Sequence, residues 1–300
     1  MVTEFFTLNT GERIPAVGLG CWMGSPGAFD LRKGMEIALK AGYRHFDTAA
    51  LYGNEDVVGD SIRASNVPRS EVFVTTKLAN GRNDVQAAFD ESLKKLNIDY
   101  IDLYLMHWPQ ATDSFVNCWK QMENLLETRK GKVKSIGISN FSVKTLNELL
   151  PHCKVIPAVN QIESHPYLPE WDVVDLCKKH NIVVTAYTPL GQANSPILKD
   201  ADIMRIAEET HTTPGQVTLS WNVQRGVGVL PKSTNETRAA QNIDLITLSE
   251  DQMDRINKIS ENPARFGRLN KIVYDPASDQ VLGWSMEKMG WEKTPYHRAA

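Results

Sequence analysis

Four polar side chains that can carry charge or transfer a proton lie next to short apolar runs in the first 107 residues of the sequence. They are Asp47, Tyr52, Lys77 and His107. A phenol can act as a general acid toward a carbonyl oxygen, and an imidazole can donate or orient a second hydrogen bond to it. A cationic Lys77, held by Asp47, would favour the ionised form of Tyr52 and lower its pKa from about 10. These residue types therefore indicate acid catalysis at a carbonyl group.

Each of the four residues also fits an ordinary structural role when it is considered alone. An aspartate in a loop before a helix commonly caps that helix, and a tyrosine in a loop commonly packs half-buried. A lysine that ends a strand is usually solvated, and a histidine beside Trp-Pro is commonly a core residue with satisfied hydrogen bonds. Spacing alone therefore does not assign these residues a catalytic role. That assignment depends on whether the fold brings the strand ends together.

The elements that would position these residues alternate between strand-like and helical patterns. After a possible hairpin at the turn Asn9-Thr10-Gly11, the strand-like runs cover residues 16–20, 44–47, 72–78, 101–107, 133–139, 157–162, 182–187 and 227–230. Helical periodicity covers residues 31–41, 55–64, 84–97, 116–128, 142–150, 170–180, 201–210, 214–224, 236–242 and 249–259. Several strand-like runs are apolar throughout, which is typical of buried parallel strands.

Eight strand–helix alternations predict an α/β fold, a (β/α)8 TIM barrel with an N-terminal β-hairpin, extra helices and an irregular tail. No linker divides the chain, so we expect a single domain over residues 1–300, with 262–300 as a C-terminal tail near the substrate site. A doubly wound domain would instead carry G-x-G-x-x-G after its first strand. The segment 18–24 places a bulky pair between its glycines, so a nucleotide would be held in another way.

The composition limits the classes of partner. A formal net charge of -3 gives no reason to expect a nucleic acid or an anionic membrane. The sequence shows no secretory signal, and no apolar run approaches the roughly 18 residues that a membrane span needs. The four cysteines are scattered without zinc-binding spacing, so we expect reduced thiols and no metal site. These features predict a cytoplasmic protein.

Eight segments resemble the signatures of the aldo-keto reductase family and occur in the family's order. They are GYRHFDTA (42–49), LYGNE (51–55), TKL (76–78), LYLMHWP (103–109), IGISNF (136–141), NQIE (160–163), YTPLG (187–191) and LPKST (230–234). The resemblance covers about residues 5–260. It implies a (β/α)8 barrel, NADPH bound extended across the barrel mouth, and hydride transfer to an aldehyde or ketone. It also places the family's catalytic residues on Asp47, Tyr52, Lys77 and His107.

The same resemblance assigns the nicotinamide end of the cofactor site. Tyr187 matches the aromatic residue that stacks on the nicotinamide ring, and three polar residues match those that bind the carboxamide: Ser139, Asn140 and Gln161. The loop over the pyrophosphate is expected at Thr188, Pro189, Leu190, Gly191 and Gln192. Further contacts are placed at Gly20, Cys21, Trp22 and Asp47. Cys21 stands where threonine is frequent, and we expect it to pack near the cofactor.

The adenosine end is assigned to the segment after the last strand. The 2′-phosphate would be bound by Lys232, Ser233, Thr234, Asn235 and Arg238. Cationic side chains and a helix N-terminus are what a dianionic phosphate needs. Asn242 matches an adenine contact, and Gln241 stands where many members of the family have glutamate.

The predicted substrate pocket departs from the family more than the catalytic residues do. Trp22 and Trp108 match its apolar walls, and Leu51 is placed beside them. Ala79 replaces the tryptophan that is common two residues after the catalytic lysine, and the loop after Pro109 is short. Both features predict a more open mouth. Two alternatives, a pocket wall or packing under the barrel, stay open for the tail aromatics Phe266, Trp284 and Trp291.

The leading hypothesis is an NADPH-dependent reductase of an aldehyde or ketone, a monomer or weak dimer. The sequence looks closest to fungal sugar, glycerol and erythrose reductases, which suggests aldoses, glyceraldehyde, uronic acids or activated ketones as substrates. One alternative is a barrel that binds NADPH but has lost turnover, against which the intact catalytic set argues. Another is a lyase with Lys77 as Schiff-base nucleophile, against which a paired Asp47 argues because it keeps the amine protonated.

Overall fold

The computed structural model describes residues 4–22, 28–82, 84–110, 114–192, 194–270, 274–275, 277–278 and 280–291. Eight parallel strands form one sheet in which the strands follow chain order. They are β3 (Leu19–Gly20), β4 (His45–Asp47), β5 (Phe73–Leu78), β6 (Ile101–Met106), β7 (Val133–Ser139), β8 (Val159–Glu163), β9 (Val183–Tyr187) and β10 (Val227–Leu230).

The sheet closes on itself between its first and last strands. Val17, just before β3, forms a parallel bridge with Val229 of β10. The Gly18 N–H donates to the Val229 carbonyl oxygen at 2.9 Å, and the Gly20 N–H donates to the Pro231 carbonyl oxygen at 3.1 Å. The (β/α)8 barrel predicted from the sequence is therefore confirmed.

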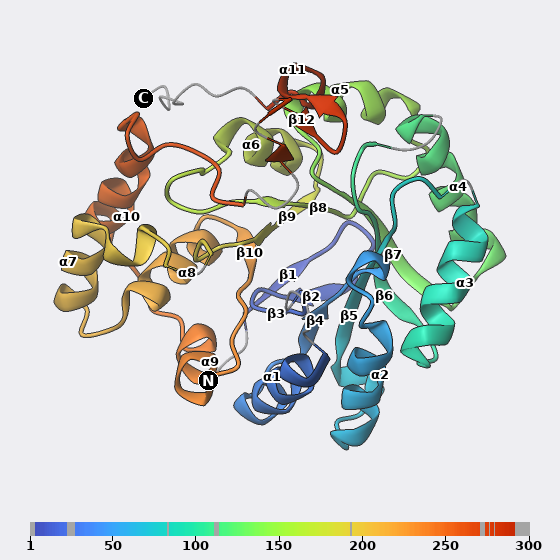
Figure 1. The fold of residues 1–300 in the computed structure, drawn as a ribbon, viewed down its shortest axis with the longest axis horizontal. Coiled ribbons are helices and arrows are strands. Elements are labelled where there is room, and N and C mark those ends of the chain that lie inside the picture. The colour runs from blue at the N-terminus through green and yellow to red at the C-terminus, as the bar shows by residue number, and fades with distance from the viewer. Residues whose placement is uncertain are drawn as a thin grey trace.

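Helices surround the barrel (Figure 1). They are α1 (Ala28–Ala41), α2 (Glu55–Ala64), α3 (Val85–Leu96), α4 (Phe115–Thr128), α5 (Val143–Leu149), α6 (Trp171–Lys179), α7 (Ala201–Glu209), α8 (Pro214–Gln224), α9 (Glu236–Ile243) and α10 (Glu250–Asn257). Each predicted strand and helix is present, with ends that differ by at most three residues. Side chains cap several helices, as Asp84 does when it accepts from the Ala87 N–H at the start of α3. Gly59 lets α2 approach α3, because a Cβ there would lie 1.7 Å from the Leu96 carbonyl oxygen.

Alternate residues of a barrel strand face the helices and the barrel interior. In β6, Tyr104 and Met106 belong to the large cluster under the helices, whereas Leu103 and Leu105 belong to a separate cluster inside the barrel. This alternation decides which strand-end side chains can reach the mouth. No helix in the described ranges is long and apolar enough to cross a lipid bilayer.

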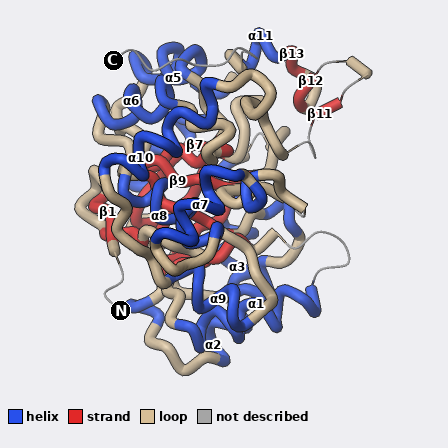
Figure 2. Tube along the Cα trace, turned by 90° about the vertical axis from the view of Figure 1, so that its left-hand side faces the viewer, coloured by secondary structure: helices blue, strands red, loops and turns tan. Residues whose placement is uncertain are grey.

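The predicted N-terminal hairpin is present and lies at one end of the barrel. β1 (Phe5–Thr7) pairs antiparallel with β2 (Arg13–Pro15). Asn9 Nδ2 donates to the carbonyl oxygen of Pro157, just before β8, at 3.1 Å. Figure 2 shows β1 on one side of the barrel and the short strands of the tail on the other. The hairpin therefore covers the amino ends of the strands and leaves the carboxyl ends as the mouth.

The tail after residue 262 is more regular than the sequence predicts. β11 (Tyr274–Asp275), β12 (Gln280–Val281) and β13 (Trp284–Ser285) form a small antiparallel sheet, and α11 (Met286–Met289) follows. The prediction of an irregular tail is wrong for this part, because strands of two residues are too short to produce a period in the sequence.

Candidate active site

Strand register directs three of the predicted catalytic residues into the barrel. Lys77 pairs with Leu105 across β5 and β6, and Leu105 faces the interior. His107 lies two residues beyond Leu105 and therefore has the same orientation. Asp47 pairs with Thr75, which lies two residues before Lys77 on β5. Asp47, Lys77 and His107 consequently point inward at the carboxyl ends of adjacent strands.

Lys77 and Asp47 form a buried ion pair. Lys77 Nζ donates to Asp47 Oδ1 at 2.5 Å and to the Thr48 carbonyl oxygen at 2.8 Å. Lys77 is 0% exposed and Asp47 is 3% exposed. Gln161 Nε2 donates to the second carboxylate oxygen, Oδ2, at 2.6 Å. The predicted pairing is therefore present, and an ammonium bound in this way has no lone pair for Schiff-base chemistry.

Tyr52 and His107 lie beside this pair. Tyr52 ends a single 3-10 turn, Ala50–Tyr52, after β4. Its ring meets the His107 ring edge to face, with centroids 5.6 Å apart. Lys77 Nζ lies 5.1 Å from the centroid of the tyrosine ring. His107 Nδ1 is buried and has no hydrogen-bond partner in the described part of the chain. The structure thus brings all four predicted catalytic residues together.

The electrostatic environment of Tyr52 differs from the predicted one. Burial raises the pKa of Tyr52 well above its ordinary value, and the negative charge of Asp47 adds to this effect. Burial, together with the positive charge of Lys77, lowers the pKa of His107 well below its ordinary value. The predicted lowering of the Tyr52 pKa by Lys77 is wrong because burial disfavours the charged phenolate, and because Asp47 balances the lysine charge at 2.5 Å. Both rings are therefore neutral at neutral pH.

The predicted nicotinamide-binding residues form a hydrogen-bonded chain along the ends of β7, β8 and β9. Asn140 Nδ2 donates to the His107 carbonyl oxygen at 3.0 Å, and Asn140 Oδ1 accepts from the Tyr187 hydroxyl at 2.7 Å. Ser139 Oγ donates to the Gln161 carbonyl oxygen at 2.8 Å. Asn140 has a φ of 66°, a left-handed conformation that asparagine adopts more readily than most residues. These hydrogen bonds line the side of β7 to β9 next to the predicted catalytic residues.

The predicted pyrophosphate loop follows β9 and turns back on itself. Thr188 has a φ of 53°, and the Gly191 N–H donates to the Thr188 carbonyl oxygen at 2.9 Å. Gln192 is exposed, and its Nε2 donates to Asn270 Oδ1 at 3.2 Å. The other two predicted loop residues are buried or packed on the core: Pro189 and Leu190. The contact with the pyrophosphate stays a prediction.

The predicted 2′-phosphate segment lies between β10 and α9. Asn235 caps α9, since its Oδ1 accepts from the Arg238 N–H at 2.9 Å, and Ser233 Oγ accepts from the Asn235 N–H at 3.1 Å. The side chains of Lys232 and Arg238 are exposed, and neither forms an ion pair with a carboxylate in the described ranges. The remaining predicted residues range from exposed to buried: Thr234, Gln241 and Asn242. Two cations beside a helix N-terminus suit an anionic group.

Trp22 and Cys21, two of the predicted cofactor contacts after β3, differ in exposure. Trp22 is 40% exposed, and Lys232 Nζ lies 5.3 Å from the centroid of its ring. Cys21 is 0% exposed. Its N–H donates to the Asp47 carbonyl oxygen at 2.8 Å, and its carbonyl oxygen accepts from Asn54 Nδ2 at 2.9 Å. Cys21 therefore packs inside the barrel wall, as expected, and its contact with a cofactor stays a prediction. Gly20 beside it is half-buried.

The residues predicted to form the pocket walls differ in the exposure of their side chains. Leu51 is 54% exposed and Ala79 is half-buried, whereas Trp108 is 6% exposed. The Trp108 ring lies 5.8 Å from that of Trp291 between centroids. Four further tail residues join the same apolar cluster: Val281, Trp284, Met286 and Met289. Trp284 and Trp291 therefore lie beside the mouth rather than under the barrel, while Phe266 is half-buried outside this cluster.

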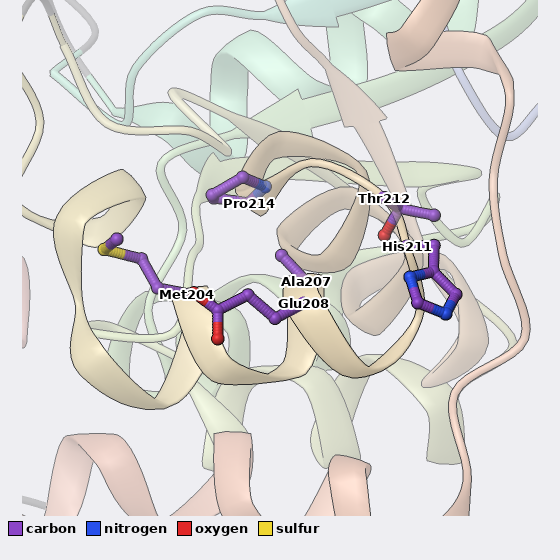
Figure 3. Close-up of a pocket in the computed structure, with 6 residues that line it drawn as sticks. All are labelled: Met204, Ala207, Glu208, His211, Thr212 and Pro214. Carbon is purple, nitrogen blue, oxygen red and sulfur yellow. The ribbon is translucent and has the colours of Figure 1, made fainter.

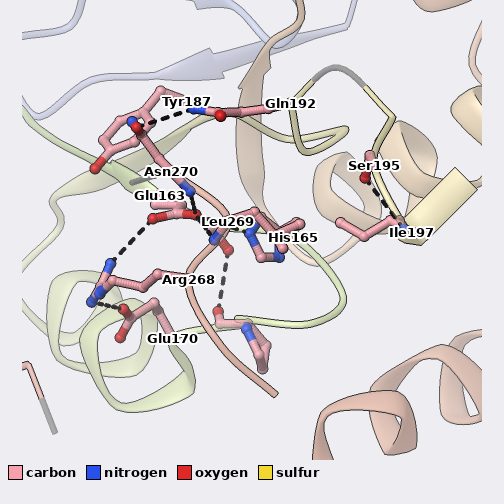
Figure 4. A network of polar contacts seen from close by, with 12 residues as sticks. Glu163, His165, Glu170, Tyr187, Gln192, Ser195, Ile197, Arg268, Leu269 and Asn270 are labelled. Carbon is pink, nitrogen blue, oxygen red and sulfur yellow. Dashed lines mark hydrogen bonds and ion pairs between the residues drawn. The ribbon is translucent and has the colours of Figure 1, made fainter. Parts of the chain in front are cut away.

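One buried carboxylate that the sequence analysis did not assign lies at the end of β8 (Figure 4). Glu163 is 1% exposed and accepts from the N–H groups of Leu269 and Asn270 at 2.6 and 2.8 Å. The only signal in the sequence is its position at a strand end, within NQIE. These two N–H donors lie more than a hundred residues further along the chain, so no local pattern predicts them.

A separate hollow lies on the outer helices α7 and α8 (Figure 3). It is lined by Met204, Ala207, Glu208, His211, Thr212 and Pro214. None of these residues belongs to the group at the barrel mouth, and we assign the hollow no role.

Comparisons with known proteins agree with the arrangement at the mouth. A family model described as "Aldo/keto reductase family" matches residues 17–261. A Saccharomyces cerevisiae glycerol 2-dehydrogenase (NADP(+)) is 43% identical over 86% of this chain and 91% of its own length. A Hypocrea jecorina D-galacturonate reductase is 41% identical over 92% of this chain and 96% of its own. A solved Bombyx mori aldo-keto reductase in complex with NADP has a TM-score of 0.83 at 33% identity, over 96% of this chain and 99% of that one.

Lys77→Met is expected to lower the free energy of unfolding by about 3–5 kcal/mol, because it leaves the Asp47 carboxylate buried without its cation. The double variant Asp47→Asn/Lys77→Met should lose less than the sum of the two single variants, since neither charge then remains. Urea unfolding of the wild type, the single variants and the double variant measures this coupling. Strictly additive losses would contradict a coupled ion pair.

Proposed function

The chain belongs to the aldo/keto reductase family, and on this basis we propose that it is an NADPH-dependent reductase of aldehydes and ketones. The observation that carries the proposal is the buried pair of Asp47 and Lys77 with the neutral rings of Tyr52 and His107 beside it. NADPH, when bound, supplies the hydride that the carbonyl carbon receives. The protein then has to supply one proton and to orient the substrate oxygen.

Tyr52 is the proton donor in this proposal. When hydride reaches the carbonyl carbon, negative charge develops on the carbonyl oxygen, and a phenol that is protonated at neutral pH transfers its proton there. The product is the alcohol, and a tyrosinate remains until it is reprotonated from solvent. Lys77, 5.1 Å from the ring centroid, stabilises that tyrosinate, and Asp47 holds Lys77 in position. The neutral His107 donates a second hydrogen bond to the substrate oxygen.

The residues at the mouth suit NADPH. Lys232 and Arg238, exposed beside the start of α9, would bind the 2′-phosphate. Asn140 and Gln161 would bind the carboxamide, and Tyr187 offers a flat ring for the nicotinamide. The NADP complex of the Bombyx mori relative and the name of the yeast relative support the same coenzyme.

We infer a small hydroxylated carbonyl compound as the substrate: a sugar aldehyde, glyceraldehyde, a uronate or an activated ketone. The names of the yeast and Hypocrea jecorina relatives support this class. Two buried amide oxygens, Asn80 Oδ1 and Gln110 Oε1, have no hydrogen-bond partner in the described ranges. They lie in the loops after β5 and β6, where substrate hydroxyl groups could donate to them.

We further propose a monomer or weak dimer in the cytoplasm. The exposed large apolar side chains of the described residues are few and scattered: Phe5, Trp22, Leu51, Met204 and Leu282. Such a surface offers no broad apolar patch for stable association. The four cysteines are free thiols, which fits a reducing compartment.

The purified protein should oxidise NADPH, followed at 340 nm, with aldoses, glyceraldehyde, uronates or diketones. Tyr52→Phe should bind NADPH like the wild type but lose about 10²- to 10⁴-fold in turnover, because the proton donor is gone. Tyr187→Phe is the matched control, since it removes a mouth hydroxyl bonded to Asn140 and should keep most of the activity. Full activity of Tyr52→Phe would remove Tyr52 from the acid role. A wild type that binds NADPH but never oxidises it would favour the non-catalytic alternative.

Lys232→Ala and Arg238→Ala should each weaken NADPH binding by about tenfold and NADH binding much less, because only NADPH carries the 2′-phosphate. Fluorescence titration with both coenzymes measures the two dissociation constants. Lys258→Ala is the control. Lys258 is exposed and follows α10, outside the predicted 2′-phosphate segment, so this variant should change neither dissociation constant. Equal losses for the two coenzymes would refute the 2′-phosphate assignment.

Ala79→Trp should reduce kcat/KM for large substrates more than for glyceraldehyde, because an indole at this half-buried position narrows the mouth. Steady-state kinetics over aldoses of increasing chain length measures the discrimination. An unchanged ranking of substrates would show that Ala79 does not line the pocket.

A further inference from the structure

The chain that leads into the tail is held to the barrel by one buried carboxylate. Glu163 Oε1 accepts from the N–H groups of Leu269 and Asn270, and it lies 3.2 Å from His165 Nε2. Glu163 Oε2 lies 3.6 Å from the Arg268 guanidinium. Although burial opposes ionisation, the hydrogen bond and charge of His165 and the charge of Arg268 hold the pKa of Glu163 below its ordinary value. Glu163 is therefore a fixed negative charge at the end of β8.

Arg268 connects Glu163 to the aromatic side chains of Trp291 and Trp108 beside the mouth. Its Nη2 donates to Glu170 Oε1 at 2.5 Å, and its Cζ lies 3.6 Å from the centroid of the Trp291 ring. The Trp291 ring in turn packs on Trp108, which directly follows His107. A guanidinium plane against an indole is a favourable stacking and cation–π contact. One set of contacts thus runs from β8 to the residue beside the proposed catalytic histidine.

Other contacts between the tail and the barrel involve the tail backbone rather than Trp291. Gln110 Nε2 donates to the Val281 carbonyl oxygen at 3.0 Å, and Lys144 Nζ donates to the Glu287 carbonyl oxygen at 2.9 Å. These bonds hold the backbone of β12 and α11, whereas Arg268 holds the indole itself.

A second tail arginine provides an internal comparison. Arg265 lies three residues before Arg268, and it pairs with Asp200 and Asp202 at 3.4 and 2.9 Å near the start of α7. Among the described residues, Arg268 alone of these two contacts Trp291. A general loss of tail charge can therefore be separated from the loss of the indole contact.

We propose that Arg268, clamped by Glu163 and Glu170, is a positioning residue that holds Trp291 against Trp108 as one wall of the substrate pocket. The inference rests on the proposed reductase function. Without the clamp, Trp291 leaves Trp108, and substrates that reach this wall lose binding. The chemical step is affected less, because Arg268 contacts neither Tyr52 nor His107 in the described contacts.

The test compares Arg268→Ala, Arg268→Lys, Trp291→Ala, the Arg268→Ala/Trp291→Ala double variant and the control Arg265→Ala. Arg268→Ala should raise KM for the best carbonyl substrate about tenfold and change kcat less than about threefold, since a stacked cation contributes roughly that much binding. The NADPH dissociation constant should stay within about twofold. Arg268→Lys keeps the charge but loses the planar stack, so its KM should lie in between. Arg265→Ala should match the wild type.

The kinetic outcomes decide between positioning and general stability. A double variant no worse than Trp291→Ala supports the proposal, because the arginine then acts through the indole. An Arg265→Ala effect equal to that of Arg268→Ala, or additive losses in the double variant, overturns it.

A measurement independent of turnover separates this proposal from the proposed function. Hydrogen exchange of the peptides covering residues 280–291 should become faster in Arg268→Ala and not in Arg265→Ala. Unchanged exchange in Arg268→Ala overturns the clamp whether or not the protein is active. If Arg268→Ala exchanges faster but the wild type reduces no carbonyl compound, the clamp is supported and the reductase function is rejected.

Discussion

The ion pair between Lys77 and Asp47 is the interaction on which the rest of the mouth depends. Enclosing both charges costs hydration that is offset only where geometry and additional hydrogen bonds are good. Lys77 Nζ has the Thr48 carbonyl oxygen as a second acceptor, and Asp47 has Gln161 as a second donor. Gln161 stands on β8, four strands from β4 in the sheet order. The closed barrel brings these two strands within hydrogen-bond distance across the interior, so the fold supplies the second donor that Asp47 needs.

This balance of charge explains why the neighbouring rings stay neutral. A lone ammonium would favour a tyrosinate, but one bound to a carboxylate leaves burial as the dominant effect on Tyr52. The same burial keeps His107 uncharged. The site therefore holds a neutral phenol and a neutral imidazole beside a cation, which suits the proposed reaction, in which negative charge first appears on the substrate oxygen. In the proposed mechanism Asp47 and Lys77 act through Tyr52, because both side chains are almost fully buried.

Strand ends could be predicted from the sequence, whereas the contacts that connect distant segments could not. The alternation of apolar runs and helical periods located each strand, and side-chain alternation then places Asp47 and Lys77 on the same side. The sign of the Tyr52 pKa shift was mispredicted because it depends on the depth of burial, which spacing does not report. The tail partners of Glu163 lie more than a hundred residues further along the chain, in a segment without helical or strand periodicity, so only the folded chain shows them.

Glu163 and Asp47 show the same kind of interaction at two strand ends: a buried carboxylate that binds a cation. Asp47 and Glu163 are both carboxylates at the carboxyl end of a barrel strand, both are nearly enclosed, and each fixes a cation from another part of the chain. Asp47 is paired with the neighbouring strands on both sides, and Glu163 is paired with Tyr187 of β9. Each carboxylate therefore attaches its cation to the backbone of the closed sheet. Asp47 in this way binds the lysine beside the proposed proton donor, and Glu163 binds the arginine that stacks on Trp291. The two carboxylates share no partner among the contacts described, so the proposed chemistry and the proposed substrate wall rest on separate interactions.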